Sequence, residues 1–227
     1  MRESVQQLGN LTQAQGKAEE FALRGEQVDE PTRRIQNAVE FLVAARSEHF
    51  DVPPIPAAVA LLKDVTKVRE SYLKDPNLIL GPGFVSFSSR LLESANAVEA
   101  IARDVWATVR AERLTVINQS LLVSLESLPG YASTISELRR LNSRAATYIM
   151  RPRVSASDLS EFLQIAEELQ AQWQVLCSPE RMPADVITFL QACAEGGAGL
   201  ALLTTGVREW LANNSLESQF RIRMNPS

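Results

Sequence analysis

The chain has 227 residues, of which 45% are hydrophobic and 22% are charged, and its formal net charge at pH 7 is −4. A chain of this length forms one large domain, or one domain with a small appendage. The acidic balance argues against a surface built throughout for nucleic acid, because such surfaces are usually basic.

The sequence also predicts the compartment. Residues 1–16 contain no apolar core of a signal peptide or anchor, and no stretch approaches the ~18 consecutive apolar residues that cross a bilayer. Cys177 and Cys193 stand among apolar residues in a helical pattern, without a CxxC pair. Because free cysteines of this kind are usual in a reducing compartment, we expect a soluble cytoplasmic protein that does not bind membranes.

The first predicted elements are helical. Residues 3–27 have a helical composition but weak amphipathicity, so this segment can fray. Pro31 occupies the first position of a predicted helix, where its missing N–H costs nothing. The apolar face of that helix carries Ile35, Val39 and Leu42 at three- and four-residue spacings.

A second helix is predicted after the stiff segment DVPPIP, with Pro56 as its first residue. Its apolar stripe carries Val59, Leu62, Val65, Arg69 and Leu73. Residues 74–84 then interrupt the pattern. They leave two alternatives, a small hairpin around Gly81 to Gly83 or a helix that begins at Gly83, and the helix is favoured.

The longest predicted element is a helix of about 40 residues from Phe84 to Leu128. Pro129 and Gly130 end it. One stripe runs from Phe84 through the valines of the segment, and a second stripe includes Trp106. A helix that is apolar on more than one side is typical of the central member of a bundle.

Two further helices are predicted at residues 131–150 and 157–177, the second preceded by SASD, which offers serine and aspartate as caps. The predicted fold class is therefore all-α. Residues 1–177 are expected to form an elongated multi-helix bundle with one long central helix.

Residues 178–227 are predicted to form a separate small module. A first helix ends at Glu195 and the pair Gly196–Gly197, which we interpret as a helix corner. A phosphate cradle is disfavoured because no lysine occurs after residue 177. Thr205 can cap a second helix, and residues 219–224 then alternate between apolar and polar side chains, as in a strand.

Helix, short turn, helix and strand follow one another in this order over residues 183–225, and this order resembles a small winged-helix module. The resemblance implies that QFRIRM takes the place of the wing. The segment's basic residues, Arg208, Arg221 and Arg223, are outnumbered by four acidic residues. Because a DNA-reading helix and wing are usually basic, the resemblance implies docking to a protein.

Residues that could carry chemistry are scattered. His49, the single histidine, stands near Glu48 and Asp51 at a predicted helix end, without the spacing of a metal site. An enzymatic role would require His49 to line a pocket with distant carboxylates. The favoured interpretation is a histidine at a helix C-terminus, so we expect no catalytic residue, no metal, no cofactor and no enzyme activity.

One charge cluster stands out. Residues 137–154 contain five arginines and one acid. Arg140, Arg144 and Arg151 fall within about 40° of one another on a helical wheel, a stripe suited to phosphate or carboxylate. The alternative is pairing within the chain, with acidic side chains such as Glu161, and it is slightly favoured.

The sequence therefore predicts a non-enzymatic interaction or scaffold protein, an accessory subunit of a larger intracellular complex that docks through its C-terminal module. The alternative is nucleic-acid binding by the arginine stripe together with that module, and self-association into a homo-oligomer is a further alternative. The candidate binding residues are Arg140, Arg144, Arg151, Arg153, Arg208, Trp210, Arg221 and Arg223.

Overall fold

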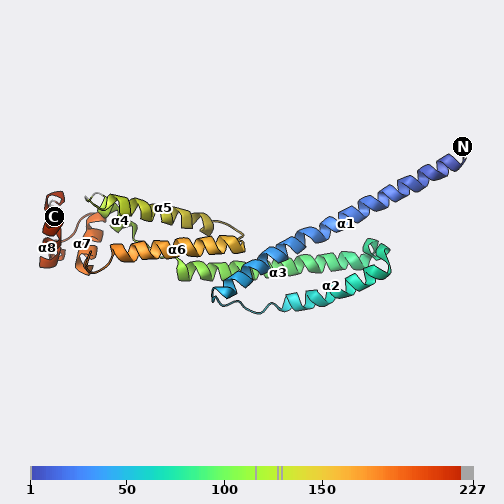
Figure 1. Cartoon of the computed structure of the whole chain (residues 1–227), viewed down its shortest axis with the longest axis horizontal. Coiled ribbons are helices and arrows are strands. Elements are labelled where there is room, and N and C mark those ends of the chain that lie inside the picture. Colours follow the sequence, from blue (N-terminus) through green and yellow to red (C-terminus); the bar gives the residue numbers. More distant parts are fainter. Residues whose placement is uncertain (1, 116, 127, 129, 221–227) are drawn as a thin grey trace. The chain divides into compact units, whose positions relative to one another are not determined.

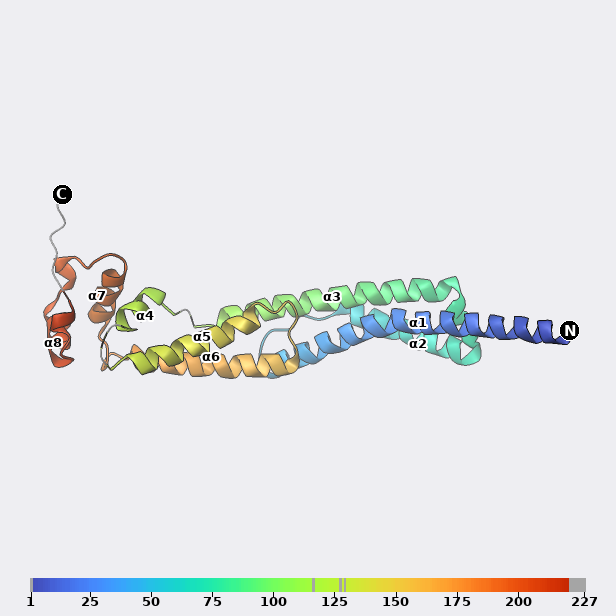
Figure 2. The same ribbon diagram turned by 90° about the horizontal axis from the view of Figure 1, so that it is seen from above.

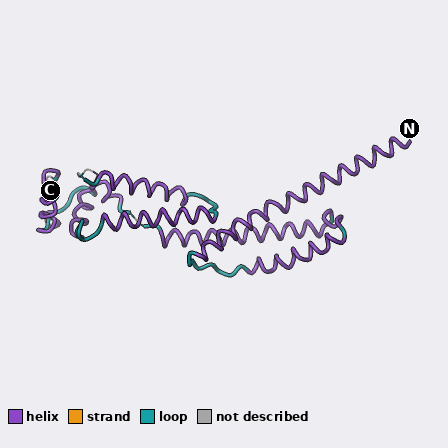
Figure 3. The backbone as a smooth tube through the Cα atoms, in the orientation of Figure 1, coloured by secondary structure: helices purple, strands orange, loops and turns teal. Residues whose placement is uncertain are grey.

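The computed structural model describes residues 2–115, 117–126, 128 and 130–220, and it gives the backbone alone for residues 2–13 and Ala57. Every regular element in these ranges is a helix, as Figure 3 shows, so the all-α prediction is confirmed. The α-helices are α1 (Arg2–Ser47), α2 (Pro56–Lys74), α3 (Pro82–Arg113), α4 (Gln119–Glu126), α5 (Ala132–Ile149), α6 (Ala156–Leu176), α7 (Ala184–Ala194) and α8 (Thr205–Asn213). Short 3-10 helices are η1 (Pro76–Leu80), η2 (Leu200–Leu202) and η3 (Glu217–Gln219).

The chain forms two compact units. The first contains residues 1–109 and 152–159, and the second contains residues 110–151 and 160–227. The C-terminal segment thus belongs to the same unit as α4, α5 and most of α6. The domain boundary expected at residue 178 stays a prediction.

In the first unit, α1, α2 and α3 pack as three neighbouring helices (Figure 1 and Figure 2). Phe84, Phe87 and Leu91 form a buried cluster on α3, as their spacing in the sequence predicts. Half-buried apolar side chains of the other elements pack against this cluster, namely Val28, Ile35, Leu61, Val68 and Ile79. The core of this unit is therefore a seam of side chains three and four residues apart, as in a coiled coil.

Helix α1 runs through Pro31, where a helix start was predicted, so that boundary prediction is wrong. A proline inside a helix removes one backbone hydrogen bond and typically costs about 3 kcal/mol. Pro31 is buried, and the neighbouring Thr32 hydroxyl donates to the Val28 carbonyl at 2.7 Å. The same buried face continues through Ala38 and Leu42. Burial of the proline ring on this face offsets the missing hydrogen bond.

The predicted single helix from Phe84 to Leu128 is also corrected, because α3 ends at Arg113 and α4 begins at Gln119. The connecting sequence Thr115-Val116-Ile117 is β-branched, which lowers helix propensity. Asn118 then caps α4, since its side-chain oxygen accepts a hydrogen bond from the Leu121 N–H at 3.1 Å. The longest helix of the chain is α1, not the segment after Gly83.

The segment between α2 and α3 forms the 3-10 helix η1, and α3 starts at Pro82. The helix alternative is thereby confirmed over the hairpin. Asp75 caps η1, because its side chain accepts a hydrogen bond from the Asn77 N–H at 3.0 Å.

In the second unit, α5 and α6 lie side by side and match the two helices predicted at these positions (Figure 1 and Figure 2). Leu138 and Leu141 of α5 and Phe162 and Leu169 of α6 are almost fully buried. Helix α7 packs on α4, and the Ser124 hydroxyl of α4 donates to the Leu190 carbonyl at 2.7 Å.

The cap predicted for α6 is also present, in the first unit. The Asp158 N–H donates to the Ser155 hydroxyl at 3.1 Å, and the Ser155 N–H donates to the Asp158 carboxylate at 2.9 Å. Such reciprocal bonds satisfy two of the N–H groups that a helix start leaves without a partner.

The glycine pair after α7 forms a helix corner, as predicted. Gly196 and Gly197 have φ angles of 119° and 131°, which favour glycine, and the Gly197 N–H bonds back to the Ala192 carbonyl. The next cap lies one residue earlier than expected. Thr204 rather than Thr205 caps α8, by accepting a hydrogen bond from the Val207 N–H at 3.1 Å.

The predicted C-terminal strand is not seen in the described residues. Gln219 ends the 3-10 helix η3, and Phe220 follows it in extended conformation, with its ring 5.4 Å from that of Phe189. The rest of the predicted strand, residues 221–224, lies outside the described residues.

Candidate interaction surfaces

Helix α2 exposes the apolar stripe that the sequence marks. Val59, Leu62 and Leu73 are 63%, 67% and 73% exposed, whereas the half-buried Leu61 and Val68 face the core. The exposed stripe lies about 100° around the helix from the side that packs on α1 and α3. We call Val59, Leu62, Val65 and Leu73 the α2 stripe.

A row of lysines runs beside the α2 stripe. Lys63, Lys67 and Lys74 are exposed and fall within about 40° of one another on the helix. Helix α2 carries four basic and two acidic residues in a chain whose net charge is −4. One of the acids, Asp64, is already paired with Arg90 of α3 at 2.8 Å. This side of α2 is therefore a positively charged rim beside an apolar surface.

An apolar hollow of about 340 Å³ lies at the C-terminal end of α2. Lys67, Tyr72, Leu78 and Phe84 are among the residues that line it. Tyr72 and Leu78 are 41% and 51% exposed. None of the α2 stripe residues lines this hollow, which opens between α2, η1 and the start of α3 on the side of α2 where Val68 packs on the core. It has room for one large side chain of another molecule.

The predicted arginine stripe of the second unit is partly paired within the chain. Arg140 donates two hydrogen bonds to Glu137, at 2.8 and 2.6 Å, which hold the pKa of that carboxyl below its usual value. The neighbouring Arg139 pairs with Glu126 of α4 at 2.7 Å. Because each of these guanidinium groups already has a carboxylate partner, the positive charge of α5 is reduced.

The two other arginines of the stripe differ from each other. The Arg144 side chain is exposed, and its guanidinium group forms no hydrogen bond or ion pair with the residues that the structure describes, while its backbone carbonyl accepts a hydrogen bond from the Thr147 hydroxyl at 2.7 Å. The Arg151 guanidinium lies 4.5 Å from the centre of the Tyr148 ring. Tyr148 in turn donates a short hydrogen bond to Glu161, the acid that the sequence offered as a partner of the arginines.

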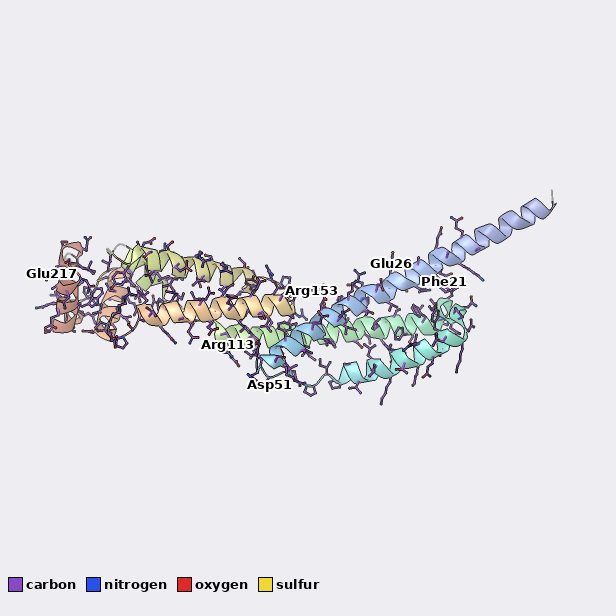
Figure 4. All side chains as sticks on the ribbon, in the orientation of Figure 1. Phe21, Glu26, Asp51, Arg113, Arg153 and Glu217 are labelled. Atoms are coloured by element: carbon purple, nitrogen blue, oxygen red, sulfur yellow. The ribbon has the colours of Figure 1, made fainter. Side chains whose placement is uncertain are left out.

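Arg153 lies outside the second unit. It belongs to the first, where its Nε lies 3.3 Å from a carboxylate oxygen of Glu99 (the labelled Arg153 precedes α6 in Figure 4). It therefore contributes to a different site from the Arg140, Arg144 and Arg151 stripe.

The candidate residues of the C-terminal module are placed differently from one another. Arg208 is exposed on α8, but Trp210 is only 7% exposed and donates a hydrogen bond to the Arg181 carbonyl at 2.9 Å. Trp210 thus holds α8 onto the rest of its unit, which the sequence did not predict. Arg221 and Arg223 lie outside the described residues.

The residues considered for chemistry lie apart. His49 is exposed in the turn after α1, with a φ of 66°. It lines neither the hollow at the end of α2 nor a second hollow formed by α1, α3 and residues 152–158. Burial raises the pKa of both thiols, Cys177 and Cys193, which disfavours the reactive thiolate. Within the described ranges, no cluster of His, Cys, Asp and Glu could hold a metal ion.

Sequence reasoning recorded the α2 stripe but not its exposure. The signal that could have found it is composition, because α2 carries lysines at residues 63, 67 and 74 close to the apolar residues of the stripe. A helix that belongs entirely to a core rarely carries so many lysines beside its apolar residues.

No helix in the part of the chain that the structure describes is both long and apolar enough to cross a membrane. Comparisons with protein-family models, with curated proteins and with solved structures found no match to this chain.

Proposed function

We propose that this protein is a non-enzymatic helical interaction protein, an accessory subunit of a larger intracellular complex, which binds an acidic amphipathic helix of a partner on α2. The observation that carries the proposal is the exposure of Val59, Leu62 and Leu73 by 63% to 73% on one face of a helix. An amphipathic partner helix buries such a face by the spacing of its own apolar residues.

The free energy gained by burying the α2 stripe is close to the cost of association, which favours a partner that makes other contacts as well. Full burial of a Val or Leu side chain contributes about 2 kcal/mol, so covering the α2 stripe contributes on the order of 5 kcal/mol. Association itself costs at least about 4 kcal/mol in lost freedom of motion. The stripe alone therefore gives weak binding, and further contacts are needed.

The lysines beside the stripe supply such contacts. Lys63, Lys67 and Lys74 select for acidic residues along the edge of the partner helix and accelerate its encounter with α2. This combination is the reason for assigning an acidic amphipathic helix as the partner.

A second surface for the same function is the C-terminal module, proposed to be winged-helix-like and to dock on a protein. It is supported by the succession of α7, η2 and α8, by the exposed Arg208 and by Leu200, which is 69% exposed on η2. Binding of nucleic acid by the stripe of Arg140, Arg144 and Arg151 together with the C-terminal module is the alternative function, and the exposed Arg144 guanidinium, which pairs with no described residue, supports it.

The test is affinity purification of the full chain from its native host, with nuclease treatment and at low and high salt. Leu62→Glu/Leu73→Glu places charge on the α2 stripe, and Val175→Glu, on an exposed valine of α6, is the matched control. We expect a stoichiometric protein partner that survives nuclease, is retained by the control and is lost from the α2 variant.

The other surfaces are separated by further variants in the same experiment. Leu200→Glu and a deletion of residues 219–227 alter the C-terminal module without touching α2. Loss of the partner in these variants, with retention in the α2 variant, would transfer docking to the module. Recovery of salt-sensitive nucleic acid and no protein would support the arginine stripe instead.

A further inference from the structure

A second hollow in the first unit has a different chemistry from the α2 surface. Its volume is about 600 Å³, within the usual range of about 300–1,000 Å³ for small-molecule sites. It is lined by residues of α1, by residues of α3 and by the segment from Pro152 to Asp158. We call it the α1–α3 cavity.

One wall of the cavity is a fixed ion pair. Arg34 donates to Glu99 from Nε at 3.1 Å and from Nη2 at 2.5 Å, and the same Nη2 donates to Asn96 at 2.6 Å. The side chains of Arg34 and Glu99 are only 15% and 18% exposed. The Arg34 Nη1 lies 3.6 Å from a carboxylate oxygen of Glu30, so each of the three guanidinium nitrogens has a partner within the protein.

Two other guanidinium groups at the cavity keep free donors. Arg153 contacts Glu99 through Nε alone, which leaves both of its Nη groups without a hydrogen bond to a described residue. Arg103 also lines the cavity, and its charge helps to lower the pKa of Glu99, but no described residue accepts a hydrogen bond from its guanidinium group. Asp158, the other acid of the lining, is engaged in the cap of α6. Arg103 and Arg153 therefore keep guanidinium N–H groups that no described residue accepts and that an anion could accept.

The floor of the same cavity is apolar. Phe41 and Trp106 are 1% and 5% exposed and pack edge to face, with ring centres 6.3 Å apart. Ala38, Ala102 and Val154 line the cavity beside them, and the two rings reach it only over the small part of their surface that stays exposed. A ligand in the cavity would place an apolar body against these smaller side chains and its charge at the arginines.

We propose that the α1–α3 cavity binds a small organic carboxylate, with the carboxylate between Arg103 and Arg153 and the apolar body against Ala38, Ala102 and Val154. Inorganic phosphate would satisfy the arginines and leave the apolar floor uncovered. A neutral apolar molecule would cover the floor and leave the arginines unused. The inference is independent of the docking surface on α2.

The test is isothermal titration calorimetry of the full chain with 2-naphthoate, octanoate, the uncharged analogue 2-naphthamide and inorganic phosphate. We expect at least one of the two carboxylates to bind with a stoichiometry of one, at least tenfold more tightly than 2-naphthamide or phosphate. The stronger of the two reports whether the apolar body is aromatic or aliphatic.

Variants locate the site. Arg103→Gln/Arg153→Gln is expected to weaken the carboxylate at least tenfold and to leave the affinity for 2-naphthamide unchanged. Arg69→Gln/Arg208→Gln removes the same charge from two exposed arginines elsewhere and is expected to bind as the unaltered chain does. No binding of either carboxylate at millimolar concentration would overturn the proposal, and so would equal affinity in the two double variants.

Discussion

Glu99 is the residue on which the ion pairs of the first unit converge. Its carboxylate accepts two hydrogen bonds from Arg34 and lies near Arg153. The hydrogen bond from Arg34 is the main cause that lowers the pKa of Glu99, and partial burial opposes it. A carboxyl whose pKa is lower in the folded state stabilises that state above its unfolded pKa, which is about 4.3.

We therefore expect Glu99→Gln to destabilise the first unit by about 1–3 kcal/mol at pH 7, since Arg34 loses a charged partner. The difference should shrink as the pH falls below about 5, because protonation of Glu99 removes the same charge from the unaltered chain. Urea unfolding at pH 7 and at pH 3 measures it. Glu93→Gln, an exposed position on the same helix, is the control. A loss of equal size at both pH values would contradict the ion-pair explanation.

At the scale of elements, the sequence located most helices but misplaced two boundaries. Helices α5, α6 and α7 follow directly from the spacing of their apolar residues and from Ser155, Gly196 and Gly197. Pro31 misled because a buried proline on a seam of a long helix looks the same in sequence as a proline at a helix start. Which stripe of α2 is buried depends on α1 and α3, and the spacing within α2 cannot decide it.

The break between α3 and α4 yields a prediction of its own. Asn118→Ala removes the cap of α4 and should destabilise the second unit by about 1 kcal/mol. Asn118→Asp keeps an oxygen acceptor at the helix start and should cost much less. Urea unfolding of the full chain compares the two. An Asn118→Ala variant that is equally or more stable would contradict the break, because alanine favours an uninterrupted helix.

At the scale of the whole molecule, each unit carries its own candidate surface. The first unit holds the α2 stripe with its lysines and the α1–α3 cavity, and the second holds the partly paired arginines on and after α5 and the C-terminal module. The interaction surfaces predicted from the sequence lie in the second unit, because clustered arginines and the winged-helix resemblance of residues 183–225 can be recognised without a structure. Exposure of an apolar stripe and convergence of Arg34, Glu99 and Arg153 arise only on folding.

Zero-length carbodiimide cross-linking of the purified complex, read by mass spectrometry, tests the central claim most directly. The reagent joins lysines to carboxylates that are in contact, and the chain has no lysine after residue 177. We predict cross-links from Lys63, Lys67 and Lys74 to glutamates or aspartates of the partner, spaced three or four residues apart in its sequence. Cross-links confined to the carboxylates of residues 184–219, with none from the α2 lysines, would contradict docking on α2.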